Sequence, residues 1–117
     1  MEKDAYISVW VGNLEGKDQL ADYIAENYDD EGNMTSGFMN DFRIDHYDAD
    51  LIEVLFDASE NTTEVFNRFS YFENFSEKLQ QIKLIGRNCF IVIYDVEFEG
   101  EVERVGTFEF IGTFKYR

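Results

Sequence analysis

Residues 89–98 carry the clearest structural pattern in the chain. Every second residue from Phe90 to Phe98 is large and apolar, and the positions between them stay apolar until Asp95. A strand with two apolar faces belongs inside a sheet that is covered on both sides, and it emerges toward solvent where acidic residues begin. The sequence therefore predicts a domain organised around one covered central strand.

Period-two patterns predict further strands over residues 6–12, 51–56 and 105–116, the first of them internal because both of its faces carry large groups. Helical spacing predicts helices over residues 18–28 and 62–83, and Ser36 is placed to cap a short helix that carries Phe38, Met39 and Phe42. The stretch 62–83 is either one helix or two, with a break at a capping box of Ser70 and Glu73. Residues 29–33 are expected to form a solvated turn, and residues 99–101 a hairpin turn. We expect one α+β domain over residues 1–117, a mainly antiparallel sheet with helices packed on one face.

The composition supports a single folded domain in a reducing compartment. The 117 residues are 44% apolar and 17% aromatic, which is enough for a real core. Cys89 is the only cysteine, so no intramolecular disulfide forms, which suits the cytoplasm. The start of the chain does not resemble a signal peptide, and its longest apolar run is far shorter than the roughly 20 residues that span a bilayer.

Acidic charge is the second dominant feature. The formal net charge is −15, and residues 1–60 contain 16 acidic residues against 3 basic ones. This balance argues against binding to nucleic acid or to an anionic lipid surface, since both need basic residues. Residues 26–53 hold nine acids and one base, Arg43, interleaved with aromatic residues that include Tyr28 and Tyr47. Two interpretations remain open: a solvated face that aids solubility, with the aromatics in the core, or a docking face for a basic partner.

The sequence offers little for catalysis. His46 is the only histidine, and Cys89 opens an apolar strand, which predicts a buried and inert thiol. Asp45, Asp48 and Asp50 supply oxygen atoms that suit a hard cation, but their spacing does not fit an EF-hand loop. Residues 12–18 resemble a P-loop only loosely and lack its Ser/Thr. We expect no enzymatic activity, no metal site and no cofactor.

Several segments, in order and with similar gaps, carry a family resemblance. They include Ser8-Val-Trp-Val-Gly-Asn-Leu14, Tyr28-Asp-Asp-Glu-Gly32, Ser36-Gly-Phe-Met-Asn-Asp-Phe42 and Asn88-Cys-Phe-Ile-Val-Ile-Tyr-Asp95, with further matches over residues 20–24, 44–52, 70–75 and 108–114. Together they resemble the immunity protein 22 family of bacterial polymorphic toxin systems. The resemblance implies a cytoplasmic antitoxin that binds a cognate toxin domain and blocks it.

Many toxins of such systems are nucleases, whose clefts are basic because they bind phosphate. An acidic domain is therefore a suitable inhibitor, and we expect a monomer or weak dimer that binds a protein and not nucleic acid or membrane. Trp10 and Phe42 are assigned to the core. Charge and chemistry alone select the expected contact residues, which are Tyr28, Asp29, Asp30, Glu31, Asp45, Tyr47, Asp48 and Asp50. The alternative is an acidic regulatory module or nucleic-acid mimic that acts on another host protein.

Overall fold

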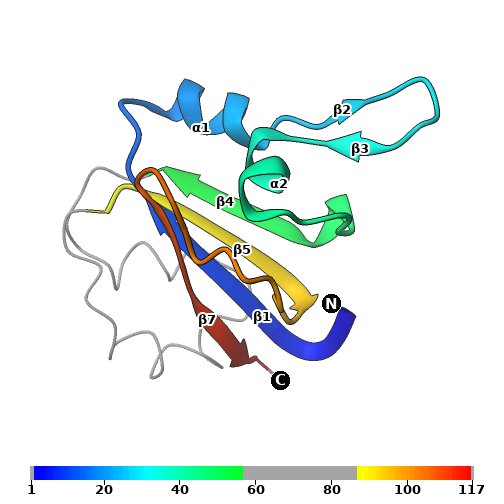
Figure 1. Cartoon of the computed structure of the whole chain (residues 1–117). Helices are drawn as coiled ribbons and strands as arrows, with labels where there is room; N and C mark the ends of the chain where they lie inside the picture. Colours follow the sequence, from blue (N-terminus) through cyan, green and yellow to red (C-terminus); the bar gives the residue numbers. More distant parts are fainter. Residues whose placement is uncertain (1, 57–86, 117) are drawn as a thin grey trace.

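The computed structural model describes residues 2–56 and 87–116, and the helix predicted over residues 62–83 lies outside them. The described residues form a five-stranded sheet in the order β4-β5-β1-β7-β6, and every neighbouring pair is antiparallel. Its strands are β1 (Glu2–Gly12), β4 (Ile52–Phe56), β5 (Cys89–Val96), β6 (Arg104–Val105) and β7 (Phe108–Lys115). Figure 1 shows β1 in the middle, between β5 and β7.

The prediction that residues 6–12 form an internal strand is confirmed. Val9 pairs with Val92 of β5 on one side and with Gly112 of β7 on the other. The strand begins earlier than predicted, at Glu2, because residues 2–5 are mostly polar and show no apolar alternation. Ala5 has a φ of 73° where the pairing with β5 changes register, so a bulge separates this polar start from the regular strand.

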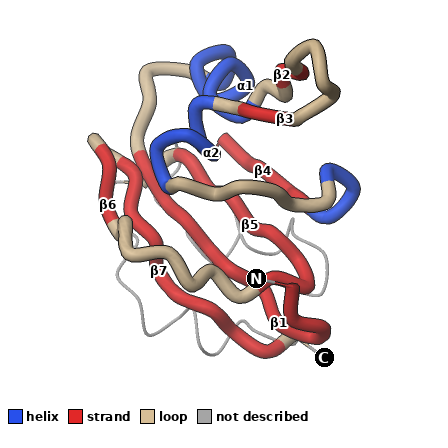
Figure 2. The backbone as a smooth tube through the Cα atoms, turned by 45° about the vertical axis from the view of Figure 1, so that its right-hand side comes forward, coloured by secondary structure: helices blue, strands red, loops and turns tan. Residues whose placement is uncertain are grey.

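Two helices cover one face of the sheet, and this confirms the predicted α+β class (Figure 2). They are α1 (Lys17–Ile24) and α2 (Gly37–Phe42). Trp10 of β1 is fully buried beneath them and lies edge-on to Phe38, with ring centroids 5.0 Å apart. Phe42 packs against the same indole, so the assignment of Trp10 and Phe42 to the core is confirmed.

The cap predicted for the short helix is also confirmed. The hydroxyl of Ser36 accepts a hydrogen bond from the backbone N–H of Met39 at 3.0 Å, which satisfies one of the free donors at the start of α2. Arg43 ends the helix in a left-handed conformation, with a φ of 56°. The chain then leaves α2 toward residues 44–48.

The first helix is shorter than predicted. It ends at Ile24, Ala25 is extended, and Tyr28 belongs to a separate two-stranded sheet of β2 (Asn27–Tyr28) and β3 (Met34–Thr35). Tyr28 fits the helical spacing by coincidence, since its side chain is 63% exposed and does not extend the buried stripe of the helix. The turn at residues 29–33 fixes the backbone on both of its sides and so ends the helical pattern before Tyr28.

The predicted hairpin at residues 99–101 is wrong. It required β5 to pair with β7, but β1 lies between these two strands. The hairpin of this region instead joins β6 to β7, with Val105 opposite Phe108 and Gly106 in the turn at a φ of 59°. Turn residues indicate where a chain reverses, but they do not show which strand it will pair with afterwards.

The second face of the sheet is buried as well. Ile7, Val9 and Val11 of β1 and Phe90 and Val92 of β5 form its core, all with side chains that are essentially inaccessible. Cys89 is buried as predicted, on the helix-covered face. In the described part of the chain, no helix is both long enough and apolar enough to cross a membrane.

Candidate functional site

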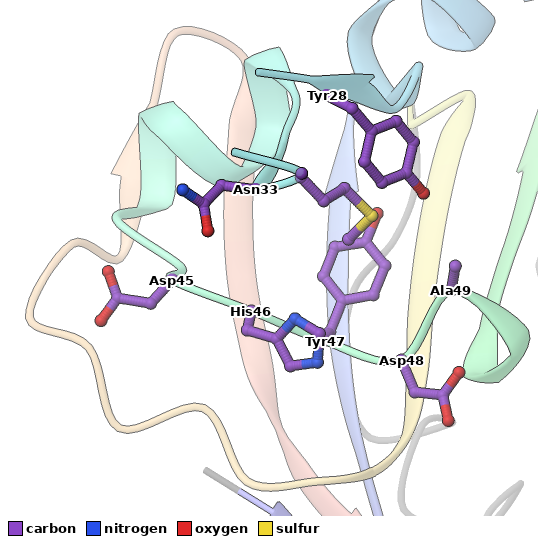
Figure 3. A pocket seen from close by; sticks show the side chains of 9 residues that line it. Tyr28, Asn33, Asp45, His46, Tyr47, Asp48 and Ala49 are labelled. Carbon is purple, nitrogen blue, oxygen red and sulfur yellow. The ribbon is translucent and has the colours of Figure 1, made fainter. Parts of the chain in front are cut away.

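An open cleft of about 600 Å³ lies between the β2–β3 hairpin and residues 45–49 (Figure 3). Its two walls come from segments that are separated in sequence by the helix α2. Most of its described lining side chains are acidic, aromatic or amide-bearing, and neither lysine nor arginine is among these described side chains. The lining residues are Tyr28, Gly32, Asn33, Met34, Asp45, His46, Tyr47, Asp48 and Ala49.

Asp29 holds the hairpin wall in shape. Its carboxylate accepts hydrogen bonds from the backbone N–H of Glu31 at 2.9 Å, and from the backbone and side-chain N–H groups of Asn33 at 2.8 and 3.1 Å. Gly32 completes the turn with a φ of 83°, a conformation that favours glycine. The bonds from Asn33 are the main reason that the pKa of Asp29 lies below its usual range. Asp29 therefore acts within the hairpin, while Asp30 and Glu31 point their charge toward solvent from its exposed tip.

The opposite wall is anchored by buried residues and carries exposed acids. Ile44 and Tyr47 are buried against the core below α2, whereas Asp45 and Asp48 are exposed. The carboxylate of Asp48 accepts a hydrogen bond from the backbone N–H of Asp50 at 2.9 Å and so begins the short helix η1 (Ala49–Leu51). Because buried and exposed residues alternate along this segment, its carboxylates lie at the rim of the cleft.

Two tyrosines meet inside the cleft. Tyr28 is the exposed one, and its hydroxyl donates a hydrogen bond to the Glu26 carboxylate at 3.1 Å, which raises the pKa of Tyr28. Tyr47 is only 3% exposed, and the hydroxyl end of its ring points toward Tyr28 (Figure 3). Burial, followed by the negative charge of Glu26, raises the pKa of Tyr47.

A second cleft, of about 390 Å³, adjoins the first. Glu2, Asp4 and Asp95 are among the residues that line it, and it shares His46, Tyr47 and Asp48 with the first cleft. Residues 46–48 thus form a wall between two acidic hollows. Among the described residues, no lysine or arginine forms an ion pair with Asp30, Glu31, Asp45, Asp48 or Asp50.

The structure gathers most of the predicted contact residues at one place. Tyr28, Asp45, Tyr47 and Asp48 line the first cleft, whereas the tip of the hairpin and η1 flank it with the other four. Tyr47 is buried, unlike the other predicted contact residues, which are exposed; it forms part of the cleft wall. Four further neighbours of this site were not predicted from the sequence, although each lies close in sequence to a predicted residue: Glu26, Asn33, Met34 and His46.

The groups considered for chemistry divide between the cleft and the core: Asp45, His46 and Asp48 line the cleft, whereas Cys89 does not. Cys89 is buried in the sheet, and desolvation raises the pKa of its thiol to about 11. Within residues 2–56 and 87–116, no three His, Cys, Asp or Glu side chains come together in an arrangement suited to a metal ion. The arrangement of this site suits contact with a cationic surface: exposed carboxylates around a hollow that contains an aromatic ring.

The fold and this face define a small, acidic, mainly antiparallel α+β domain with an open cleft at one end of its helical layer. The sequence model of the family named Immunity protein 22 matches residues 7–117, nearly the whole chain. The chain therefore belongs to the Immunity protein 22 family, as its segments had indicated, and this membership supports an immunity role that involves binding to a cognate toxin protein. No curated protein and no solved structure matches the chain.

Proposed function

We propose that this protein neutralises a cognate toxin domain of a polymorphic toxin system by binding it with the acidic face. We define the acidic face as the exposed carboxylates around the first cleft, which are Asp29, Asp30, Glu31, Asp45, Asp48 and Asp50. The observation that carries the proposal is the convergence of two acidic segments on one cleft, which no lysine or arginine of residues 2–56 and 87–116 lines. Inhibition comes from occupancy, without any reaction on the toxin.

The charge of this face suggests the kind of toxin. A nuclease must present Lys and Arg to the phosphates of its substrate, so its cleft is positive and attracts a negative surface. Opposite charges steer two proteins together and raise the association rate above the value for neutral surfaces. We therefore infer that the toxin is a basic nuclease and that the complex forms in the cytoplasm. Rapid capture there limits the time in which free toxin damages nucleic acid.

Co-expression tests the immunity role directly. The full chain, carrying an affinity tag, is produced together with the C-terminal domain encoded by the neighbouring toxin gene. We expect restored growth and a complex that co-elutes at low salt and dissociates as ionic strength rises. Failure of both rescue and co-elution would reject the proposal.

Charge variants test which face binds. The variant Asp45→Lys/Asp48→Asn/Asp50→Lys keeps an acceptor at position 48 for the bond that begins η1. The matched control, Glu99→Lys/Glu101→Lys/Glu103→Gln, makes the same change in net charge in an acidic segment that lines neither cleft. We expect the first variant alone to slow association by more than about tenfold and to flatten its salt dependence. Equal effects of the two variants would mean that net charge matters and the acidic face does not.

A further inference from the structure

We infer that the first cleft receives the side chain of one arginine of the toxin, with the guanidinium lying on the ring of Tyr28 and hydrogen-bonded to the hydroxyl of Tyr47. This inference rests on the proposed function and names the chemistry of the contact. The cleft supplies three features that a guanidinium requires: a flat exposed ring, nearby carboxylates and a free hydrogen-bond acceptor.

Tyr47 provides the most specific observation. Its side chain is 97% buried, yet its hydroxyl has no hydrogen-bond partner among the described residues and faces the cleft (Figure 3). The hydroxyl oxygen itself is not enclosed, so it is accessible to a group that enters the cleft from outside. A hydroxyl oxygen directed into a negative hollow accepts a hydrogen bond from a cationic N–H donor.

Tyr28 provides the platform. Among the described residues it is the only large apolar or aromatic side chain that is strongly exposed, at 63%. Its hydroxyl is held by Glu26 at 3.1 Å, so the ring has a defined direction and the Glu26 carboxylate lies at the edge of the platform. The ring therefore loses little conformational freedom when a partner stacks on it.

Charge excludes most other occupants. Asp45 and Asp48 line the cleft with Tyr28 and Tyr47, and no lysine or arginine in the described part of the lining offsets them. An anionic or wholly apolar side chain would have to enter against these charges or leave them poorly solvated. Arginine fits better than lysine because its planar, weakly hydrated guanidinium stacks on aromatic rings and donates to several acceptors at once.

The test uses the full chain and the toxin domain from the neighbouring gene, after the wild-type complex has been shown to form. We expect Tyr28→Ala to weaken binding by about tenfold or more, and Tyr47→Phe, which removes only the hydroxyl, by about fivefold. Tyr28→Phe should lose less than Tyr28→Ala because the ring remains. The matched control is Tyr23→Phe, which removes a hydroxyl bonded to Asp41 outside the cleft and should leave affinity unchanged.

A double-mutant cycle then identifies the occupant. Each arginine of the toxin is changed singly to lysine, and affinity is measured against wild-type protein and against Tyr28→Ala. We expect one Arg→Lys change to weaken binding to the wild type by about tenfold and to have little further effect on Tyr28→Ala. A complex that forms but is insensitive to both tyrosine variants, or in which no arginine couples to Tyr28, would overturn this inference and leave the immunity role intact. Absence of any wild-type complex would instead reject the proposed function itself.

Discussion

Trp10 combines the largest side-chain volume in the core with an unpartnered polar atom. Its indole is fully buried among Phe38, Phe42 and Phe98, while its Nε1–H has no hydrogen-bond partner among the described residues. A buried donor without a partner lowers stability, but the packing of the ring outweighs this loss. The packing of the indole ring, and not a hydrogen bond from its N–H group, therefore stabilises Trp10 in the core.

Two substitutions at Trp10 separate these contributions. Trp10→Ala should lower the free energy of unfolding by about 3–5 kcal/mol, because it leaves a large cavity beneath α2. Trp10→Phe should lower it by less than half as much, since a ring remains and the unpartnered donor is removed. Urea titration followed by circular dichroism measures both. Equal losses would show that the indole N–H is satisfied in solution.

Cys89 gives a prediction about pH. Burial raises the pKa of its thiol to about 11 from about 9 for an exposed thiol. Below pH 9 the thiol is protonated in both the folded and the unfolded state. Between about pH 9 and 11 only the unfolded thiol ionises, so the free energy of unfolding should fall over this range. Cys89→Ala should show a shallower fall in urea titrations at these pH values, and an identical slope would place the thiol at the surface.

At the scale of elements, the β2–β3 hairpin determines how Tyr28 is presented. Asp29 bridges the backbone of Glu31 and Asn33 across the turn, and Tyr28 immediately precedes it. We therefore assign Asp29 a positioning role within the acidic face. Because these bonds keep the pKa of Asp29 low, they persist until the pH falls below its ordinary range, and protonation then loosens the turn.

Substitution of Asp29 distinguishes positioning from direct contact. Asp29→Ala should speed amide hydrogen exchange at Asn33 and weaken toxin binding. Asp29→Asn keeps a side-chain oxygen acceptor, so it should preserve the exchange rate and most of the affinity. Hydrogen exchange by NMR and a binding assay report the two effects. If Asp29→Asn binds as weakly as Asp29→Ala, the charge of Asp29 contacts the toxin directly.

Local signals determined which elements were predictable. The strand at 89–96 follows from alternation, and the start of α2 follows from Ser36, because both depend on residues close in sequence. The end of α1 was not predictable from spacing, since Tyr28 fits a helical stripe yet is exposed. The pairing of the strands was not predictable either, because β1 pairs with β5 and β7, which lie far from it in the sequence.

At the scale of the whole molecule, salt should have opposite effects on folding and on binding. The net charge of −15 is concentrated in residues 1–60, so free protein experiences strong self-repulsion. Raising NaCl from 20 to about 300 mM should raise the melting temperature of the free chain and weaken the toxin complex. Calorimetric melting and binding assays in the same buffers check this. A complex that tightens with salt would contradict an electrostatic interface.

For the candidate site, the types of residue were predictable from the sequence, but their arrangement in space was not. Charge and aromatic content selected residues within 28–31 and 45–50 as contact candidates, but the convergence of these two segments on one cleft depends on how α2 folds back over the sheet. The burial of Tyr47 depends on the same packing, and so does the participation of Met34 and His46. A linear sequence reports the chemistry of each wall, whereas the space between the walls arises from tertiary structure.

The central place of β1 has a consequence for synthesis on the ribosome. Both strands that flank β1 come from residues 89–115, so β1 has no sheet partner until that later part of the chain has emerged. Pairings between such distant segments also form slowly compared with local ones. The sheet of a nascent chain therefore stays incomplete until residues 89–115 have left the ribosome.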